Sequence, residues 1–137
     1  MDGSHADFYI GLGKTAKWIG SVEGCGAPGD VTANWDLLNE AGAIDDYTET
    51  DFRDMVRHII TDARADNAGY RPEDGDEWPW RHLSSAETDY AYAYNNGCIH
   101  VFERGYMVAQ HYPNGARRKS EFPERPWGSW PTPGGDT

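Results

Sequence analysis

Lysine, cysteine and long apolar runs are all scarce in this chain. Of its 137 residues, three are lysines and two are cysteines, Cys25 and Cys98. Two cysteines cannot build the dense disulfide scaffold of a small secreted protein, so we expect a reducing, cytoplasmic setting. No apolar stretch approaches the roughly 20 residues of a membrane-spanning helix. The first residues lack the basic and apolar segments of a signal peptide, so no membrane association is expected.

Basic residues are also in short supply relative to acidic ones. The chain holds 23 Asp and Glu against 12 Lys and Arg, which gives a formal net charge of −11. Such a charge repels phosphate backbones, so direct binding of nucleic acid is not expected. It favours a partner with a basic surface, including the groove of a nucleic-acid-binding protein. The alternative is that the acidity is a solubility or salt adaptation of the host proteome.

The length suits one domain. We expect an α+β fold over residues 1–112, with an antiparallel sheet of about five strands and one main helix packed on one face. Residues 113–137, rich in Pro, Gly and Trp, are expected to form an irregular C-terminal tail.

The main helix is predicted over residues 51–65 by apolar residues at helical spacing. These residues are Phe52, Met55, Val56, Ile59, Ile60 and Ala63. Thr50 is the expected N-cap, and Asp51 and Asp54 suit the positive end of the helix dipole. A shorter helix is expected over residues 34–41, and strands over residues 8–10 and 16–22.

Alternation and two tight turns predict a three-stranded meander over residues 88–111. Asn96-Gly97 is a strong hairpin signal, and Arg104-Gly105 marks the second turn. Two-residue turns set a register that places Tyr90, Tyr92, Tyr94, Ile99, Val101, Tyr106 and Val108 on one face. The other face would hold Ala91, Ala93, Cys98, His100, Phe102, Met107, Ala109 and His111. Because its alanines are small, we expect the helix to cover this second face.

In this register Cys98 lies opposite His111, with His100 two residues along the same face. One thiolate and two imidazoles could hold zinc or copper. A zinc site usually needs a fourth ligand, and this face is also the expected core face. Half-buried structural side chains are therefore preferred over a metal site, and no cofactor is expected.

Motifs for catalysis are missing. Residues 11–15 (GLGKT) end like a phosphate-binding loop, but Phe8 occupies the place of its first glycine and no apolar-faced helix follows. A turn between strands is the preferred interpretation. There is no nucleophile elbow and no Cys/His dyad in a recognisable context. Asp89, the one acid predicted inside a strand, is expected to pair with Arg104. We therefore favour a non-enzymatic protein.

Acidic residues gather at the start of the main helix and in the loop over residues 73–77. This loop closes on Trp78-Pro79-Trp80, which is expected to anchor it to the domain body. The acids are interpreted as a docking face for a basic partner, with the indoles supplying contact area. A merely solvated loop is the alternative. The candidate partner-binding residues are Asp45, Asp46, Glu49, Asp51, Asp54, Glu73, Asp74, Asp76, Glu77, Trp78 and Trp80.

Short blocks of the sequence resemble small proteins encoded by phages and prophages. They cover residues 7–13 (DFYIGLG), 18–21 (WIGS), 78–80 (WPW) and 88–92 (TDYAY). The resemblance implies an accessory protein of a mobile element, and small acidic phage proteins are often inhibitors of host defence. We expect a binding inhibitor of a host protein, such as a nucleic-acid-binding defence complex, which would make it anti-CRISPR-like or a nucleic-acid mimic. The alternatives are a metal-binding protein or small enzyme using the Cys/His face, and a virion or assembly component.

Overall fold

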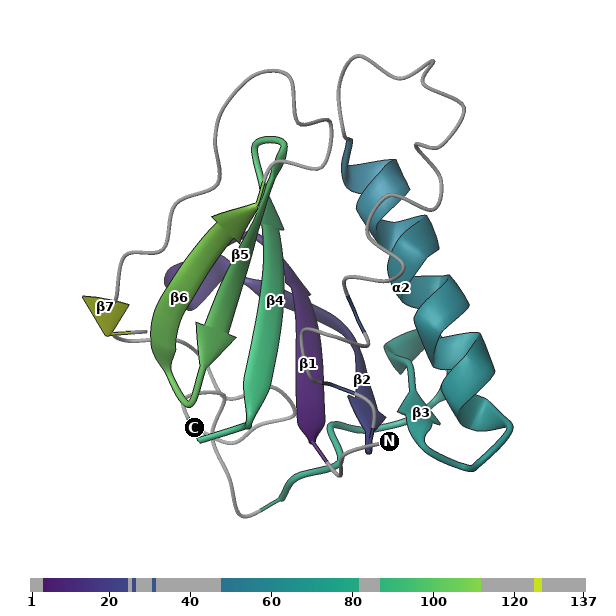
Figure 1. Cartoon of the computed structure of the whole chain (residues 1–137). Coiled ribbons are helices and arrows are strands. Elements are labelled where there is room, and N and C mark those ends of the chain that lie inside the picture. The colour runs from purple at the N-terminus through teal and green to yellow at the C-terminus, as the bar shows by residue number, and fades with distance from the viewer. Residues whose placement is uncertain are drawn as a thin grey trace.

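The computed structural model describes residues 4–24, 26, 31, 48–81, 87–111 and 125–126, with the backbone alone at 111, 125 and 126. One sheet runs in the order β3-β2-β1-β4-β5-β6-β7, and the helix α2 packs against one face of it (Figure 1). The long strands are β1 (His5–Ile10), β2 (Lys17–Glu23), β4 (Tyr90–Asn95), β5 (Cys98–Glu103) and β6 (Tyr106–His111). Two-residue strands, β3 (Gly69–Tyr70) and β7 (Arg125–Pro126), complete it. The predicted α+β class is confirmed, while the helix expected at 34–41 and most of the C-terminal tail lie outside the described residues.

The sheet is mixed, and the prediction of a fully antiparallel sheet is wrong. β1 pairs in parallel with β4, from Ala6 opposite Tyr90 to Ile10 opposite Tyr94. The other pairings are antiparallel. Parallel neighbours need a long crossover, and the connection from β2 to β4 contains α2. Hairpin turns reveal only strands that follow each other directly, so this distant pairing has no local sign in the sequence.

The main helix, α2, spans Glu49–Arg64 and buries all six of the apolar side chains predicted for its inner face. Phe52 stacks on Tyr94 of β4 with ring centroids 5.7 Å apart. The N-cap is Thr48 rather than Thr50. The Thr48 hydroxyl accepts a hydrogen bond from the Asp51 amide, and the Asp51 carboxylate accepts one from the Thr48 amide. This capping box satisfies two otherwise unpaired amides, so the helix begins one residue before Thr50.

None of the helices in the described ranges combines the length and the apolar character that crossing a bilayer requires.

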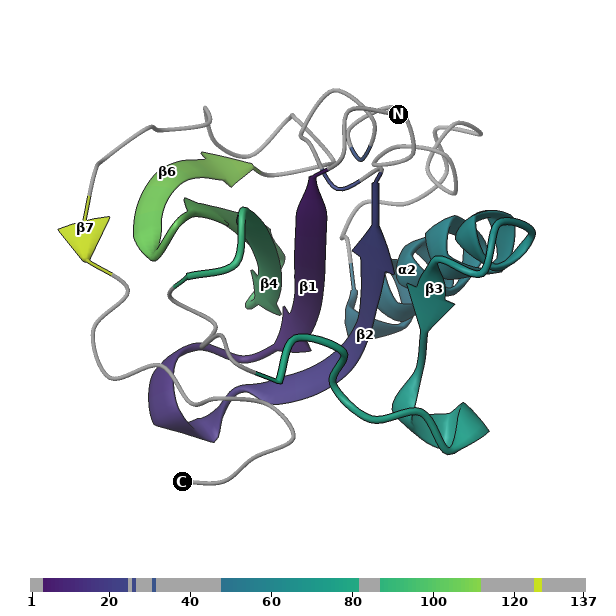
Figure 2. The same cartoon turned by 90° about the horizontal axis from the view of Figure 1, so that it is seen from below.

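The helix covers the tyrosine face of the meander, opposite to the face predicted. Tyr92 stacks on Phe8 with centroids 5.5 Å apart, in the same core cluster as Ile99 and Val101. The opposite face holds a second cluster of Tyr9, Ala91, Ala93, Phe102 and Met107, with Leu12, Ala16 and Trp18 packed against it. Figure 2 shows how β2 bends around this side of the sheet. The small alanines on this face are covered by the curved strand β2 and the indole of Trp18, rather than by a helix.

A β-bulge shifts the register between β5 and β6, the last two strands of the meander. Val101 pairs with Ala109 but Phe102 pairs with Met107, so Val108 is an extra residue in β6. His111 therefore pairs with Ile99, and the predicted pairing of Cys98 with His111 is wrong.

The glycine-rich segment after β1 is a turn, as predicted. The 3-10 turn η1 (Gly13–Thr15) leads directly into β2. Gly11 and Gly13 have φ angles of 92° and 67°, a region that glycine adopts without steric cost. With a strand following it, this turn lacks the helix N-terminus that a phosphate loop uses.

Two glycines set how closely α2 approaches the sheet. A Cβ at Gly20 of β2 would overlap the Cδ1 methyl of Ile60, whereas a Cβ at Gly69 of β3 would lie 2.5 Å from the Ile60 carbonyl oxygen. We expect Gly20→Ala and Gly69→Ala each to lower the free energy of unfolding by about 1–3 kcal/mol. Ile60→Val removes Cδ1, so it should relieve the loss at Gly20 but not at Gly69, where backbone is in the way.

Double-mutant cycles from urea denaturation would measure both couplings. Equal coupling of Ile60→Val to the two alanines would contradict this account of the packing.

Candidate functional site

The predicted docking acids that the structure describes lie on α2 and on the loop that follows it. We define the acidic surface as the exposed side of α2 together with residues 71–77, which include the 3-10 turn η3 (Pro72–Asp74). Residues 48–77 contain nine carboxylates and four arginines. Two of the predicted docking residues, Asp45 and Asp46, lie outside the described residues. The others that precede Trp78 are all placed on or beside this surface.

The acids of α2 are each engaged within the chain. Glu49 pairs with Arg53 at 2.8 Å, and Asp54 pairs with Arg57 at 3.4 Å. Asp51 is the capping-box carboxylate. The exposed pairs are one helical turn apart, a spacing that contributes only about 0.3–0.5 kcal/mol each. These carboxylates are oriented by their arginines but remain open to solvent.

Asp74 and Asp76 of the loop are held by ion pairs to Arg64 and Arg71. Asp74 bonds to the guanidinium groups of both Arg64, at 3.0 Å, and Arg71, while Asp76 lies 3.2 Å from Arg64. The bond from Arg71 lowers the pKa of Asp74. The loop is thus held to the end of α2 through Arg64, and its carboxylates are presented on a fixed backbone.

The outer loop acids are held only weakly. Glu73 lies 3.6 Å from Arg57, and Glu77 lies 3.9 Å from Arg81, both longer than a hydrogen bond. The Glu77 side chain is 82% exposed.

The two predicted indoles do not contribute contact area to this surface, because both are buried. Trp78 is 5% and Trp80 is 7% exposed. Their role as the anchor of the loop is confirmed, whereas their proposed role as exposed partner contacts is not compatible with this burial.

The anchor point is the carboxylate of Asp7, which is completely buried in β1. Its Oδ1 accepts hydrogen bonds from Ser21 Oγ at 2.6 Å, Trp78 Nε1 at 2.9 Å and Trp80 Nε1 at 2.8 Å. Its Oδ2 accepts one from Thr88 Oγ1 at 2.9 Å. One carboxylate therefore joins β1, β2, the Trp78–Trp80 segment and the residues before β4.

A second layer supports this centre. Trp18 Nε1 donates to Ser21 Oγ at 2.8 Å, which directs the serine hydroxyl proton toward Asp7. The His5 ring stacks on Trp80 with centroids 4.0 Å apart and planes 5° from parallel. Asp89 pairs with Arg104 at 2.8 Å, as predicted. Its carboxylate also accepts a hydrogen bond from the His5 backbone amide.

Sequence reasoning missed Asp7 because the first strand was predicted to start at Phe8. The strand begins at His5, so Asp7 lies inside it, while Asp89, the acid predicted inside a strand, precedes β4. The available signal was an acid in an apolar run, Ala6-Asp7-Phe8-Tyr9-Ile10. A carboxylate there must find buried donors, and tryptophan, serine and threonine supply them.

The proposed metal ligands do not form a site in the described side chains. Cys98 and His100 are buried, and His100 pairs with Ala93 of the second cluster, on the face away from α2. Burial lowers the pKa of His100, and its Nδ1 lies 3.4 Å from the Gln110 amide nitrogen. Among the described side chains, no group of three His, Cys, Asp or Glu could hold a metal. The side chain of His111 is not among them, so the metal site stays a prediction. The pairing of Cys98 with His111 on which it was based is not the one observed.

Comparisons of the chain with protein-family models, with curated proteins and with solved structures gave no match.

We expect Asp7→Asn to destabilise the protein strongly. The amide replaces one carboxyl oxygen with an NH2 group, so the buried indole and hydroxyl donors lose an acceptor, at a cost of about 2–4 kcal/mol. Asp89→Asn is the matched control, because its partner Arg104 is largely exposed, and it should cost about 1 kcal/mol or less. Urea denaturation measures both, and a similar small loss in the two variants would show that the Asp7 bonds matter little.

The Asp7 carboxyl also has a characteristic effect on pH dependence. Burial raises the pKa of Asp7, opposed by the hydrogen bonds from Ser21, Trp80, Thr88 and Trp78. With the native pKa above that of the unfolded chain, the folded protein binds more protons between the two values, so its stability falls as pH rises through them. The advantage of wild type over Asp7→Asn should therefore be largest below the ordinary pKa of 3.8 and shrink as pH rises above it. Unfolding of both proteins across this range tests the sign, and an advantage that grows with pH would contradict it.

Proposed function

We propose that this protein is a non-enzymatic binding protein whose acidic surface docks on a basic surface of another protein and blocks it. The observation that carries the proposal is the composition of that surface, eight carboxylates and four arginines on one helix and the loop beside it. Charge complementarity of this kind steers association and selects against wrong partners.

The internal ion pairs are compatible with such a role. Exposed pairs contribute about 0–1 kcal/mol, so an incoming lysine or arginine can take over a carboxylate at little cost. The backbone beneath is fixed by the apolar face of α2 and by the Arg64 bonds to the loop. A preorganised surface loses little conformational entropy when it binds.

The expected partner is a host protein that binds nucleic acid, such as a defence complex, in the cytoplasm of the host. A groove that holds nucleic acid presents basic residues to phosphate groups. The carboxylates of the acidic surface offer the same groove an alternative set of anions. The phage-like blocks of the sequence support an origin in a mobile element, in which such an inhibitor has a use.

Affinity capture from host extract, with the partner identified by mass spectrometry, tests the proposal. We expect a basic, nucleic-acid-binding protein that is released between about 0.1 and 0.5 M NaCl, because salt screens exposed charges over a few ångströms. Duplex DNA should compete with the capture. A partner that stays bound unchanged in about 1 M NaCl would count against an electrostatic interface.

Paired variants locate the interface. Asp62 is an exposed residue of α2 that lies 3.5 Å from His58, so Asp62→Asn with Glu77→Gln removes two charges from the acidic surface. Glu87→Gln with Glu103→Gln removes two exposed charges elsewhere. The first pair should weaken binding to the purified partner several-fold by calorimetry, and the second should not. Equal losses would show that net charge alone drives the association.

A further inference from the structure

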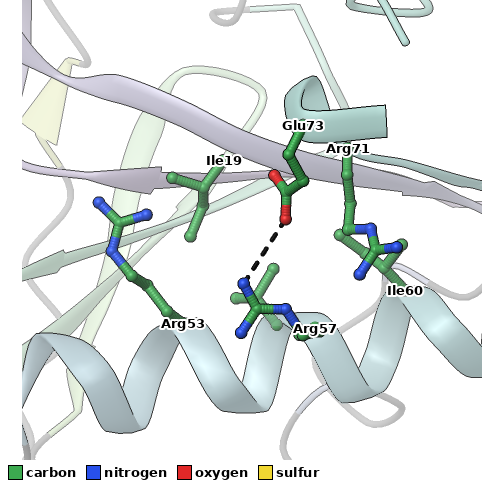
Figure 3. Close-up of a pocket in the computed structure, with 7 residues that line it drawn as sticks. Ile19, Arg53, Arg57, Ile60, Arg71 and Glu73 are labelled. Carbon is green, nitrogen blue, oxygen red and sulfur yellow. Dashed lines mark ion pairs between the residues drawn. The ribbon is translucent and has the colours of Figure 1, made fainter. Parts of the chain in front are cut away.

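A small hollow, open to solvent, lies between α2, β2 and η3. Charged side chains surround it, and the buried side chains of Ile19 and Ile60 lie beneath them (Figure 3). The lining residues are Ile19, Val56, Ile60, Arg53, Arg57, Arg71 and Glu73. Three arginines thus line one hollow in a chain of net charge −11, with Arg53 and Arg71 on either side of Arg57 (Figure 3).

The three arginines are held from outside the hollow. Arg53 pairs with Glu49, Arg57 with Asp54, and Arg71 with Asp74, and none of these carboxylates is a lining residue. Carboxylates in this position orient a guanidinium group and leave its other N–H donors free to bond elsewhere. In this arrangement carboxylates outside the hollow position the arginines that line it, as acids do around an arginine that binds an anion.

Glu73 is the single carboxylate among the described lining residues. Figure 3 shows its side chain reaching from η3 toward Arg57. The closest approach is 3.6 Å, and the two side chains are 51% and 55% exposed. An exposed pair beyond hydrogen-bond distance is held weakly. Glu73 therefore occupies the hollow without filling the hydrogen-bonding capacity of the arginines around it.

We propose that this hollow is an oxyanion-binding subsite that Glu73 occupies in the free protein. When the Glu73 side chain moves out, the arginines accept a carboxylate or phosphate group of another molecule. Arginine suits this task because its planar fork binds such groups through two parallel hydrogen bonds. The surrounding acids disfavour polyanions, so the ligand carries a single anionic group.

This site lies within the acidic surface, but binding of a small anion there can be tested without a partner. The probes are sodium propionate and inorganic phosphate, added at constant ionic strength against sodium chloride. The proteins are wild type, Glu73→Gln, Glu73→Gln with Arg57→Gln, and Glu103→Gln. Glu103 is an exposed residue of β5, several strands away from the hollow, so its variant controls for the loss of one charge.

Amide and arginine Nε–Hε shifts in ¹H–¹⁵N spectra report binding at the hollow. We expect Glu73→Gln to bind one of the probes about tenfold more tightly than wild type. Resonances of Arg53, Arg57 and Arg71 should shift together and saturate. Adding Arg57→Gln to Glu73→Gln should remove this gain in affinity. Adding Arg53→Gln to Glu73→Gln instead should also remove it. Saturation by propionate or by phosphate distinguishes a carboxylate ligand from a phosphate ligand.

Two results would overturn the proposal. One is a gain in Glu103→Gln equal to that in Glu73→Gln, which would reduce the effect to net charge. The other is the absence of saturable shifts in Glu73→Gln while its spectrum remains that of the folded protein. Neither result bears on capture of a basic partner, so the two proposals fail separately.

Discussion

The buried carboxylate of Asp7 is the interaction on which the arrangement of this protein depends. It accepts hydrogen bonds from Ser21, Trp78, Trp80 and Thr88, which belong to three other segments of the chain. Burying a charge is costly unless donors surround it, and here donors surround it. The two indoles add large apolar area to these bonds. The same contacts therefore close the sheet, seat the loop that follows α2, and bring the chain to the start of β4.

Local features of the fold were predictable from sequence, and features that join distant segments were not. The apolar stripe from Phe52 to Ala63 predicted α2 because a helix repeats every 3.6 residues. Asn96-Gly97 predicted its hairpin because its turn type needs residues that tolerate positive φ. The β1–β4 pairing left no local signal. The bulge at Val108 was also hidden, and one extra residue was enough to move His111 away from Cys98.

The candidate site shows the same division. Composition identified an acidic stretch after α2, and the stretch lies on the surface as expected. It did not reveal that Arg57, Arg64 and Arg71 would converge on it, because these residues are brought there by the helix and by η3. The indoles next to the acids were interpreted as contact residues, since aromatic side chains are common in interfaces. Their N–H groups instead satisfy Asp7, a need that became visible only once Asp7 was placed inside a strand.

Net charge and local charge therefore have to be considered separately in this protein. The chain as a whole is strongly acidic, yet three of its arginines line one hollow, and each is paired with an outer carboxylate. Long-range steering depends on the summed charge, whereas contact within a few ångströms depends on which groups are fixed and which are free. A basic partner would be attracted by the summed charge and selected by the fixed groups that it contacts. The rigid attachment of the loop, through Arg64 on one side and Trp78 and Trp80 on the other, is what gives this mixed pattern a fixed geometry.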